Sequence, residues 1–201
     1  MLNCKIVNKF YFEGKFPNFK FFAANPMRPD INPEAEFAYG SGRINPSKAA
    51  YPGLVYDAVE ADYINLLCGQ GYSTKLLQIV TGNRKNSCRK SSSARLASDL
   101  INYPAFVLSA SPSEPINHVF NRTVTNVGSP SSTYKSNLVA PPGLKITVSP
   151  DVLAFSSLGE KRSYAVTVQG TMDQKILVSA SLVWDDGTYQ VRSPIIVYVP
   201  M

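Results

Sequence analysis

The feature that most constrains the fold is a change in hydrophobic period near residue 99. Beyond this point apolar residues recur at every second position, which places them on one face of a strand. The clearest examples are Phe120 and Val124, Ile146 and Val148, Tyr164, Val166 and Val168, Val178, Ala180, Leu182 and Trp184, and Ile195, Val197 and Val199. Turn-forming residues separate these runs, and residues 184–188 between the last two predict a hairpin. Six or seven short strands in about 100 residues predict an antiparallel β-sandwich over residues 99–201.

The preceding stretch, residues 23–98, has a different character. Prolines and glycines recur between residues 25 and 57, and they exclude a long helix there. Tyr63, Leu66 and Leu67 then follow helical spacing, with acidic residues before them and glycines after them. A second short helix is predicted from Ser73, as its N-terminal cap, to Val80, with Gly82 just beyond its end.

Composition narrows the classes of protein to consider. Hydrophobic residues make up 44% of the 201 residues, which excludes a disordered tail, and no apolar run of about 18 residues is present to span a bilayer. The net charge of +6 is mild, and the basic stretch at residues 84–95 lacks aromatic residues that would stack on bases. Three cysteines and one histidine make a poor zinc set. We therefore expect no nucleic-acid partner, no membrane partner, no metal and no cofactor.

The first 22 residues are unlike the rest of the chain. Their aromatic residues are interrupted every few positions by charged ones, so no continuous apolar segment of a signal peptide is present. We expect residues 1–22 to be a poorly ordered extension.

Six stretches carry a family resemblance, in the same order and at similar spacing along the chain: residues 32–46, 52–57, 62–72, 99–104, 122–128 and 183–195. They resemble plant subtilisin-like serine proteases of the cucumisin group. The resemblance implies that residues 23–98 are the end of the peptidase domain with a helical connector. It also implies that residues 99–201 are a fibronectin type III-like β-sandwich. The expected fold is thus mainly β, preceded by a short α/irregular remnant of an α/β catalytic domain.

The catalytic residues of such proteases are not found in the sequence. A serine protease of this kind carries its catalytic Asp, His and Ser on three separate sequence motifs. None of these three motifs is present in this sequence. His118 is the only candidate base, and it falls in the predicted sandwich, where the family has no catalytic histidine. Asp185 and Asp186 could suggest acid–base chemistry, but a hairpin turn explains them better. We predict that the chain has no catalytic residues and is not an enzyme by itself.

Two other readings of the chain stay open. It could be a free-standing fibronectin type III-like module that binds a protein or wall partner. It could also be a serine hydrolase with a new active site built around His118. The resemblance favours a non-catalytic C-terminal region of a serine endopeptidase, whose partner is the upstream catalytic domain of the same chain.

The resemblance to a secreted family has further implications. It implies an extracellular location in the apoplast and a disulfide between Cys68 and Cys88, with Cys4 left over. Two reduced thiols are the alternative if the chain stays in the cytosol. The only sequon is residues 121–123, and Asn121 would face outward if Phe120 and Val124 face inward.

One part of the chain would lose its cover if the catalytic domain were absent. Apolar side chains gather between residues 37 and 56: Phe37, Tyr39, Leu54, Val55 and Tyr56. We expect these side chains to form an exposed apolar surface through which the chain self-associates.

Overall fold

The structure, a computed structural model, describes residues 32–42, 51–88, 101–112, 114–172 and 176–200. The chain divides into two compact units. One comprises Met1–Tyr56 together with Pro104–Met201, and the other is Asp57–Tyr103. The predicted extension over residues 1–22, with Cys4, lies outside the described residues.

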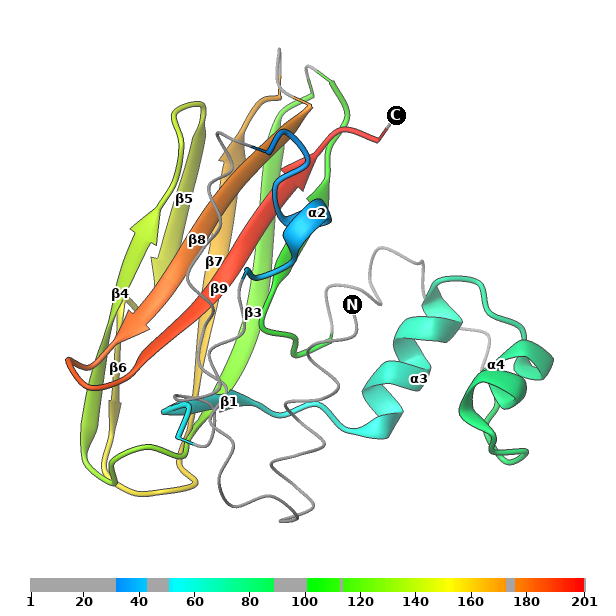
Figure 1. The fold of residues 1–201 in the computed structure, drawn as a ribbon, viewed down its shortest axis with the longest axis horizontal. Helices are drawn as coiled ribbons and strands as arrows, with labels where there is room; N and C mark the ends of the chain where they lie inside the picture. Colours follow the sequence, from blue (N-terminus) through cyan, green and yellow to red (C-terminus); the bar gives the residue numbers. More distant parts are fainter. Residues whose placement is uncertain (1–31, 43–50, 89–100, 113, 173–175, 201) are drawn as a thin grey trace. The chain divides into compact units, whose positions relative to one another are not determined.

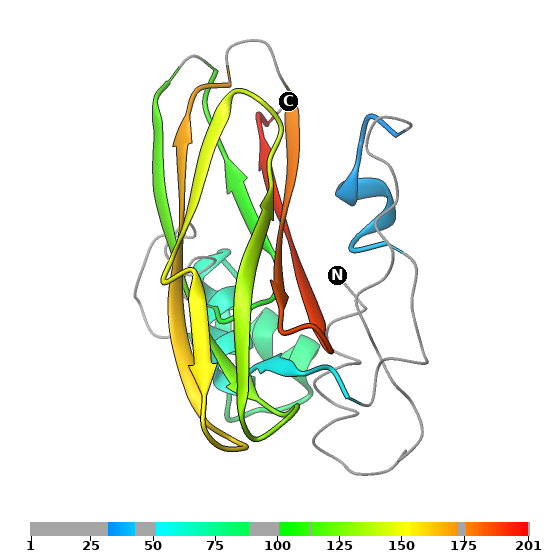
Figure 2. The same ribbon diagram turned by 90° about the vertical axis from the view of Figure 1, so that its left-hand side faces the viewer.

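The larger unit contains two β-sheets. One has four strands in the order β1 (Leu54–Tyr56), β3 (Ile116–Asn126), β7 (Lys161–Gly170), β5 (Leu144–Ser149). The other has five strands in the order β2 (Phe106–Ser109), β9 (Gln190–Tyr198), β8 (Leu177–Asp185), β4 (Ser132–Val139), β6 (Val152–Phe155). The sheets pack face to face as two layers (Figures 1 and 2). This confirms the predicted fold class, a mainly β protein with a fibronectin type III-like sandwich.

The strand pairing follows the alternation of the sequence. The predicted hairpin is formed by β8 and β9, which pair antiparallel from Leu177 opposite Tyr198 to Asp185 opposite Gln190. Every strand pair is antiparallel except β2 with β9, where Phe106 lies opposite Ile195 and the strands run parallel. The sandwich is therefore antiparallel with one parallel edge strand.

Aromatic side chains fill the core between the two sheets. Trp184 is completely buried, and its ring meets that of Tyr164 edge-on with 5.0 Å between centroids. Phe106 and Phe120 make a similar contact at 5.4 Å. Edge-to-face pairs of this kind are worth about 0.5–1.5 kcal/mol each beyond the area they bury. The core therefore joins strands of both sheets.

Strand β1 extends the sandwich beyond the boundary predicted at residue 99. Its three residues pair with the end of β3, with Leu54 opposite Asn126 and Tyr56 opposite Val124. Leu54 and Tyr56 are only 2% and 6% exposed. The expectation that these two side chains form an exposed apolar surface is therefore wrong, because they pack into the sandwich core.

The smaller unit contains the two predicted helices, α3 (Glu60–Gly69) and α4 (Thr74–Thr81). Asp62 accepts a hydrogen bond from the backbone N–H of Val59 at 2.9 Å, which caps the start of α3. The hydroxyl of Ser73 accepts one from the N–H of Leu76 at 3.3 Å, and Gly82 ends α4 in the left-handed conformation with φ 68°. Within the described ranges, no helix is long and apolar enough to cross a membrane.

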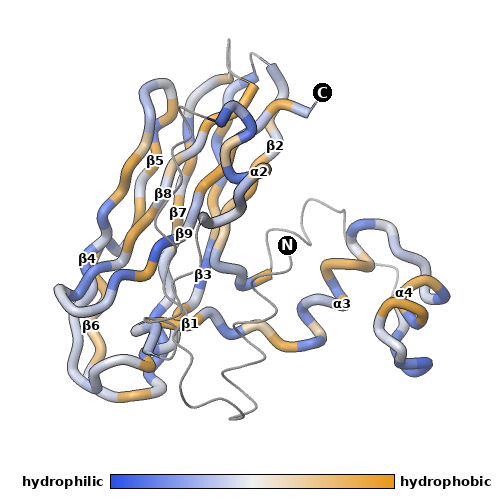
Figure 3. The backbone as a smooth tube through the Cα atoms, viewed as in Figure 1, coloured by the Kyte–Doolittle hydropathy of each residue, from blue (hydrophilic) through white to orange (hydrophobic). Residues whose placement is uncertain are grey.

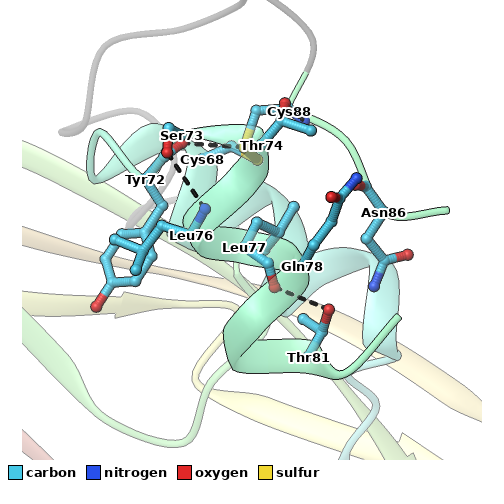
Figure 4. The surroundings of a disulfide bond; sticks show 10 residues. All are labelled: Cys68, Tyr72, Ser73, Thr74, Leu76, Leu77, Gln78, Thr81, Asn86 and Cys88. Atoms are coloured by element: carbon cyan, nitrogen blue, oxygen red, sulfur yellow. Dashed lines mark hydrogen bonds between the residues drawn. A yellow bond between two sulfur atoms is a disulfide. The ribbon is translucent and has the colours of Figure 1, made fainter. Parts of the chain in front are cut away.

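A disulfide joins Cys68, near the end of α3, to Cys88, beyond α4 (Figure 4). The two Cα atoms are 5.4 Å apart and the bond closes a loop over a sequence separation of 20. This is the pairing that the family resemblance implied. Figure 3 shows both hydrophobic and hydrophilic stretches within α4.

Candidate functional site

The candidate catalytic residues lie on different elements, His118 on β3 and the acidic pair at the turn between β8 and β9. His118 lies on β3, half-buried, with its ring edge-on to Phe120 at 4.4 Å. Asp185 accepts hydrogen bonds from the N–H of Gly187 at 2.7 Å and from the side chain of Gln190 at 2.7 Å. These bonds shape the β8–β9 turn, which agrees with the hairpin interpretation of the acidic pair.

Asp186 stabilises the same turn. Its Oδ1 accepts hydrogen bonds from the N–H groups of Thr188 at 2.9 Å and Tyr189 at 2.6 Å. The described part of the chain contains no cluster of three or more His, Cys, Asp or Glu side chains that could hold a metal ion.

The feature with the most specific chemistry is the contact between the sandwich and residues 32–42, which we call the docked segment. This segment carries the short helix α2 (Glu36–Tyr39), which lies against the outer face of the five-stranded sheet, beside β8 and β9 (Figure 2). Prolines and glycines surround it in the sequence, so it forms one helical turn and no more.

Glu36 is the centre of this contact. Its side chain is buried, and Oε1 accepts a hydrogen bond from the hydroxyl of Ser179 on β8 at 2.7 Å. The same oxygen lies 3.5 Å from a guanidinium nitrogen of Arg192 on β9. Both charged side chains are largely withdrawn from water, with relative exposures of 4% and 11%. Removing one partner of such a buried pair typically costs about 3–5 kcal/mol because the other charge is left uncompensated.

Two further contacts fix the docked segment on the sheet. Besides this ion pair, Arg192 donates a hydrogen bond to the carbonyl of Ser41 at 3.2 Å. The ring of Phe37 meets Tyr198 edge-on at 5.2 Å, although Phe37 itself is 57% exposed. Ile196, which alternation places on this outer face, is only 5% exposed. The docked segment is therefore held by an ion pair, hydrogen bonds and an aromatic contact together.

A buried group of hydroxyls attaches β1 to both sheets. The hydroxyl of Tyr56 hydrogen-bonds to that of Tyr164 on β7 at 2.6 Å and to that of Ser193 on β9 at 2.8 Å. Burial, and then the neighbouring Tyr56, raises the pKa of Tyr164 well above its ordinary value, so this hydroxyl stays protonated. The group is a structural anchor for the chain just after the docked segment.

Other residues of the resembling stretches also have structural roles. Arg122 is buried, with its guanidinium carbon 4.9 Å from the ring centre of Phe106 and 5.5 Å from that of Phe120. Asn126 is completely buried and donates to the carbonyl of Ser129 at 2.7 Å. Sequence reasoning missed these roles, although the alternation that turns Phe120 inward also turns Arg122 inward.

The predicted orientation of the sequon is confirmed. Phe120, Arg122 and Val124 are buried, whereas Asn121, which lies between Phe120 and Arg122, is exposed. Nothing in the sequence marked Glu36 as a buried charge, since its partners lie more than 140 residues further along the chain.

Comparison with known proteins fits this architecture. Residues 100–197 match the family described as Fibronectin type-III domain. Subtilisin-like protease SBT4.3 of Arabidopsis thaliana is 45% identical over 177 residues, covering 87% of this chain and 24% of that protein. SBT4.4 of the same plant is 49% identical over 166 residues, covering 81% of this chain and 22% of that protein. SBT4.14, also from Arabidopsis thaliana, is 44% identical over 180 residues, covering 89% of this chain and 24% of that protein.

The first of these matches shows that the chain contains a fibronectin type-III domain, and the others show the family to which the chain belongs. The chain corresponds to the C-terminal part of a plant subtilisin-like protease. It spans about a quarter of the length of the curated relatives it matches. A solved structure of a FixG-related protein from Vibrio parahaemolyticus aligns over 44% of this chain and 94% of that one, at 8% identity and a TM-score of 0.34.

Proposed function

We propose that this chain is a non-catalytic C-terminal region of a subtilisin-like serine endopeptidase, inactive in peptide-bond hydrolysis by itself. In this proposal it joins the end of the peptidase domain to the fibronectin type-III domain and acts outside the cell. The observation that carries the proposal is the docked segment, which belongs to the stretch resembling the end of the peptidase domain and is anchored by Glu36 to Ser179 and Arg192.

The anchor gives the domain a mechanical role. A segment that leaves the catalytic domain and is fixed on β8 and β9 determines where the sandwich stands relative to that domain. The buried charge pair makes this position specific, because Arg192 loses its compensating charge whenever the docked segment detaches. The partner is thus the upstream catalytic domain of the same polypeptide.

The lack of activity is tested on the purified chain. We expect no turnover of casein and no labelling by a fluorophosphonate probe, because the sequence offers neither an activated serine nor an oxyanion site. Casein turnover that disappears in His118→Ala would overturn the proposal and would support a new active site instead.

The anchoring role is tested by replacing the matching part of SBT4.3 with this chain. We expect the chimaera to be secreted and active, and Glu36→Ala to reduce the yield of active protease strongly. Glu36→Gln is the matched control, since it can keep the hydrogen bond to Ser179 while losing the ion pair with Arg192, and it should be intermediate. Equal yields from all three chimaeras would contradict the role of the docked segment and favour a free-standing binding module.

A further inference from the structure

The net positive charge of the chain is concentrated in one stretch of the sequence. Residues 63–98 contain six of the 20 Lys and Arg residues and none of the 14 Asp and Glu residues, so they alone account for the net charge of +6. The remainder of the chain is neutral overall. No aromatic residue follows Tyr72 in this stretch, so its chemistry favours a partner bound through charge and not through ring stacking.

Three of these cations belong to the described part of the helical unit, and we call them the basic cluster. Lys75 lies on α4, and Arg84 and Lys85 lie in the turn that follows this helix. All three residues are exposed, and none of them forms an ion pair with a described residue. Their charges are therefore not neutralised within the described part of the chain.

The side chain of Gln78 holds this turn against α4. Its Nε2 donates hydrogen bonds to the carbonyl oxygens of Arg84 at 2.9 Å and of Asn86 at 3.1 Å. Lys75 and Gln78 are three residues apart on the helix, so their side chains are neighbours on one helix face. The turn is thus attached to the face of α4 that carries Lys75.

Further bonds fix the backbone of the turn. Oδ1 of Asn83 accepts a hydrogen bond from the N–H of Lys85 at 3.0 Å, and the carbonyl of Asn83 accepts one from the N–H of Asn86 at 3.2 Å. The disulfide then ties Cys88 to the end of α3. The backbone that carries Arg84 and Lys85 is therefore organised before a ligand arrives, which lowers the entropy lost on binding.

One acidic side chain lies near the basic cluster. Oε1 of Glu60, the first residue of α3, accepts a hydrogen bond from the side-chain nitrogen of Asn86 at 3.4 Å. Glu60 forms no ion pair with any of the three cations. Its charge repels an anion that approaches the turn, so its removal should favour binding of an anion there.

We propose that the basic cluster binds a linear polymer of uronic acids, the class of polysaccharide that gives plant walls their carboxylates. Such a polymer carries a series of carboxylates along a flexible chain, so it reaches the cation on the helix and the two on the turn together. It needs no aromatic platform, which a single-stranded nucleic acid would use. The proposal adds a ligand to the extracellular role proposed above, and its test uses no protease activity, so the two fail separately.

The test measures binding of the full chain to immobilised polygalacturonate by surface plasmon resonance. We expect saturable binding at about 0.05 M salt that weakens strongly at about 0.3 M, because salt screens exposed charges. Fully methyl-esterified polygalacturonate has the same sugar chain without the charges and should not bind. Binding to the esterified polymer would overturn the proposal. Binding at least as tight to single-stranded DNA or to phosphatidylserine vesicles would also overturn it.

Charge removal locates the site. Arg84→Gln combined with Lys85→Gln should weaken binding about five-fold, the effect of losing two exposed charge pairs. Lys135→Gln combined with Lys145→Gln is the matched control, since it removes two exposed charges from the sandwich. The control should change the affinity less than about two-fold. Equal losses in the two double variants would show attraction to net charge alone and would overturn the proposal.

A gain of affinity separates binding from loss of folding. Glu60→Gln removes the repelling charge, while its Oε1 can still accept the hydrogen bond from Asn86, and it should strengthen binding about two-fold. Glu114→Gln, which removes an exposed acid between β2 and β3, is its control and should have a smaller effect. No gain in Glu60→Gln, or the same gain in both variants, would contradict binding at the basic cluster.

Discussion

The sandwich and the helical unit achieve stability in different ways. The sandwich encloses large side chains completely, including Trp184, Tyr134 and Phe106. In the described part of the helical unit, α4 buries Leu77 but leaves Ile79 69% exposed and Val80 57% exposed. The helical unit has the disulfide, and the described residues of the sandwich contain no second one. The smaller region, which buries fewer large side chains, thus carries the covalent link that restrains its unfolded chain.

The strongest test of this difference is the same substitution in both regions. Leu182 in the sandwich and Leu77 in α4 are both fully buried. Leu182→Ala should lower the free energy of unfolding of the sandwich by about 2–5 kcal/mol, followed by Trp184 fluorescence in urea. Leu77→Ala should leave that transition in place and reduce the helical circular dichroism signal. Equal shifts of the Trp184 transition would show that the two regions unfold together.

Replacing both Cys68 and Cys88 by serine isolates the contribution of the covalent link. Losing the closure of this loop should destabilise the helical unit by about 3 kcal/mol, because the unfolded chain regains its freedom. Helical circular dichroism at increasing temperature measures the change, and Trp184 fluorescence should report an unchanged sandwich. Retention of the full helical signal in the double variant would contradict the comparison.

Gly53 tests how closely β1 is fitted into the sandwich. Its φ is +80°, and an added Cβ would lie 2.6 Å from the Cβ of Tyr189 and 2.8 Å from the hydroxyl of Tyr134. Gly187 has a similar φ of +86° but open space around it. Gly187→Ala should cost the sandwich about 1–2 kcal/mol, the price of a left-handed backbone alone. Gly53→Ala should cost more, and equal urea midpoints for the two variants would show that β1 is loosely placed.

The smallest expected effect is a pH dependence of the sandwich. The pKa of Glu160 lies below its ordinary value of 4.5, mainly because the carboxylate accepts a hydrogen bond from the backbone N–H of Ser156. The Ser156 hydroxyl and the Arg162 guanidinium lower this pKa further. The folded state thus favours the charged form, so its contribution is complete above pH 4.5 and is lost as pH falls below that value. Glu160→Gln should flatten this part of the curve of Trp184 unfolding midpoint against pH. An unchanged curve would mean that other carboxylates cause the acid sensitivity.

Local patterns predicted a large share of the fold. The β8–β9 hairpin follows from alternation ending at Trp184 and from the turn around Gly187, and α4 follows from Ser73 and Gly82 at its ends. Each of these signals lies within a few residues of the structure it specifies. The family resemblance supplied the pairing of Cys68 with Cys88, which local patterns alone leave open.

The parts that could not be predicted depend on distant partners. Strand β1 has only three residues, and its assignment to the sandwich rests on pairing with residues 124–126. Glu36 meets Ser179 at a separation of 143 residues, and nothing in its neighbourhood distinguishes it from a solvated acid. Burial of this charge becomes visible only when β8 and β9 are placed beside it.

The route of the chain through β1 affects what happens to the protein when a protease cleaves its backbone. The polypeptide enters the sandwich at Leu54, leaves it after Tyr56 to make the helical unit, and returns at Phe106. The helical unit is thus an insertion between two strands of one domain, not a neighbour preceding it. A single break in the backbone of this insertion would leave both new ends attached to strands of the same sandwich, so a nicked molecule would remain in one piece.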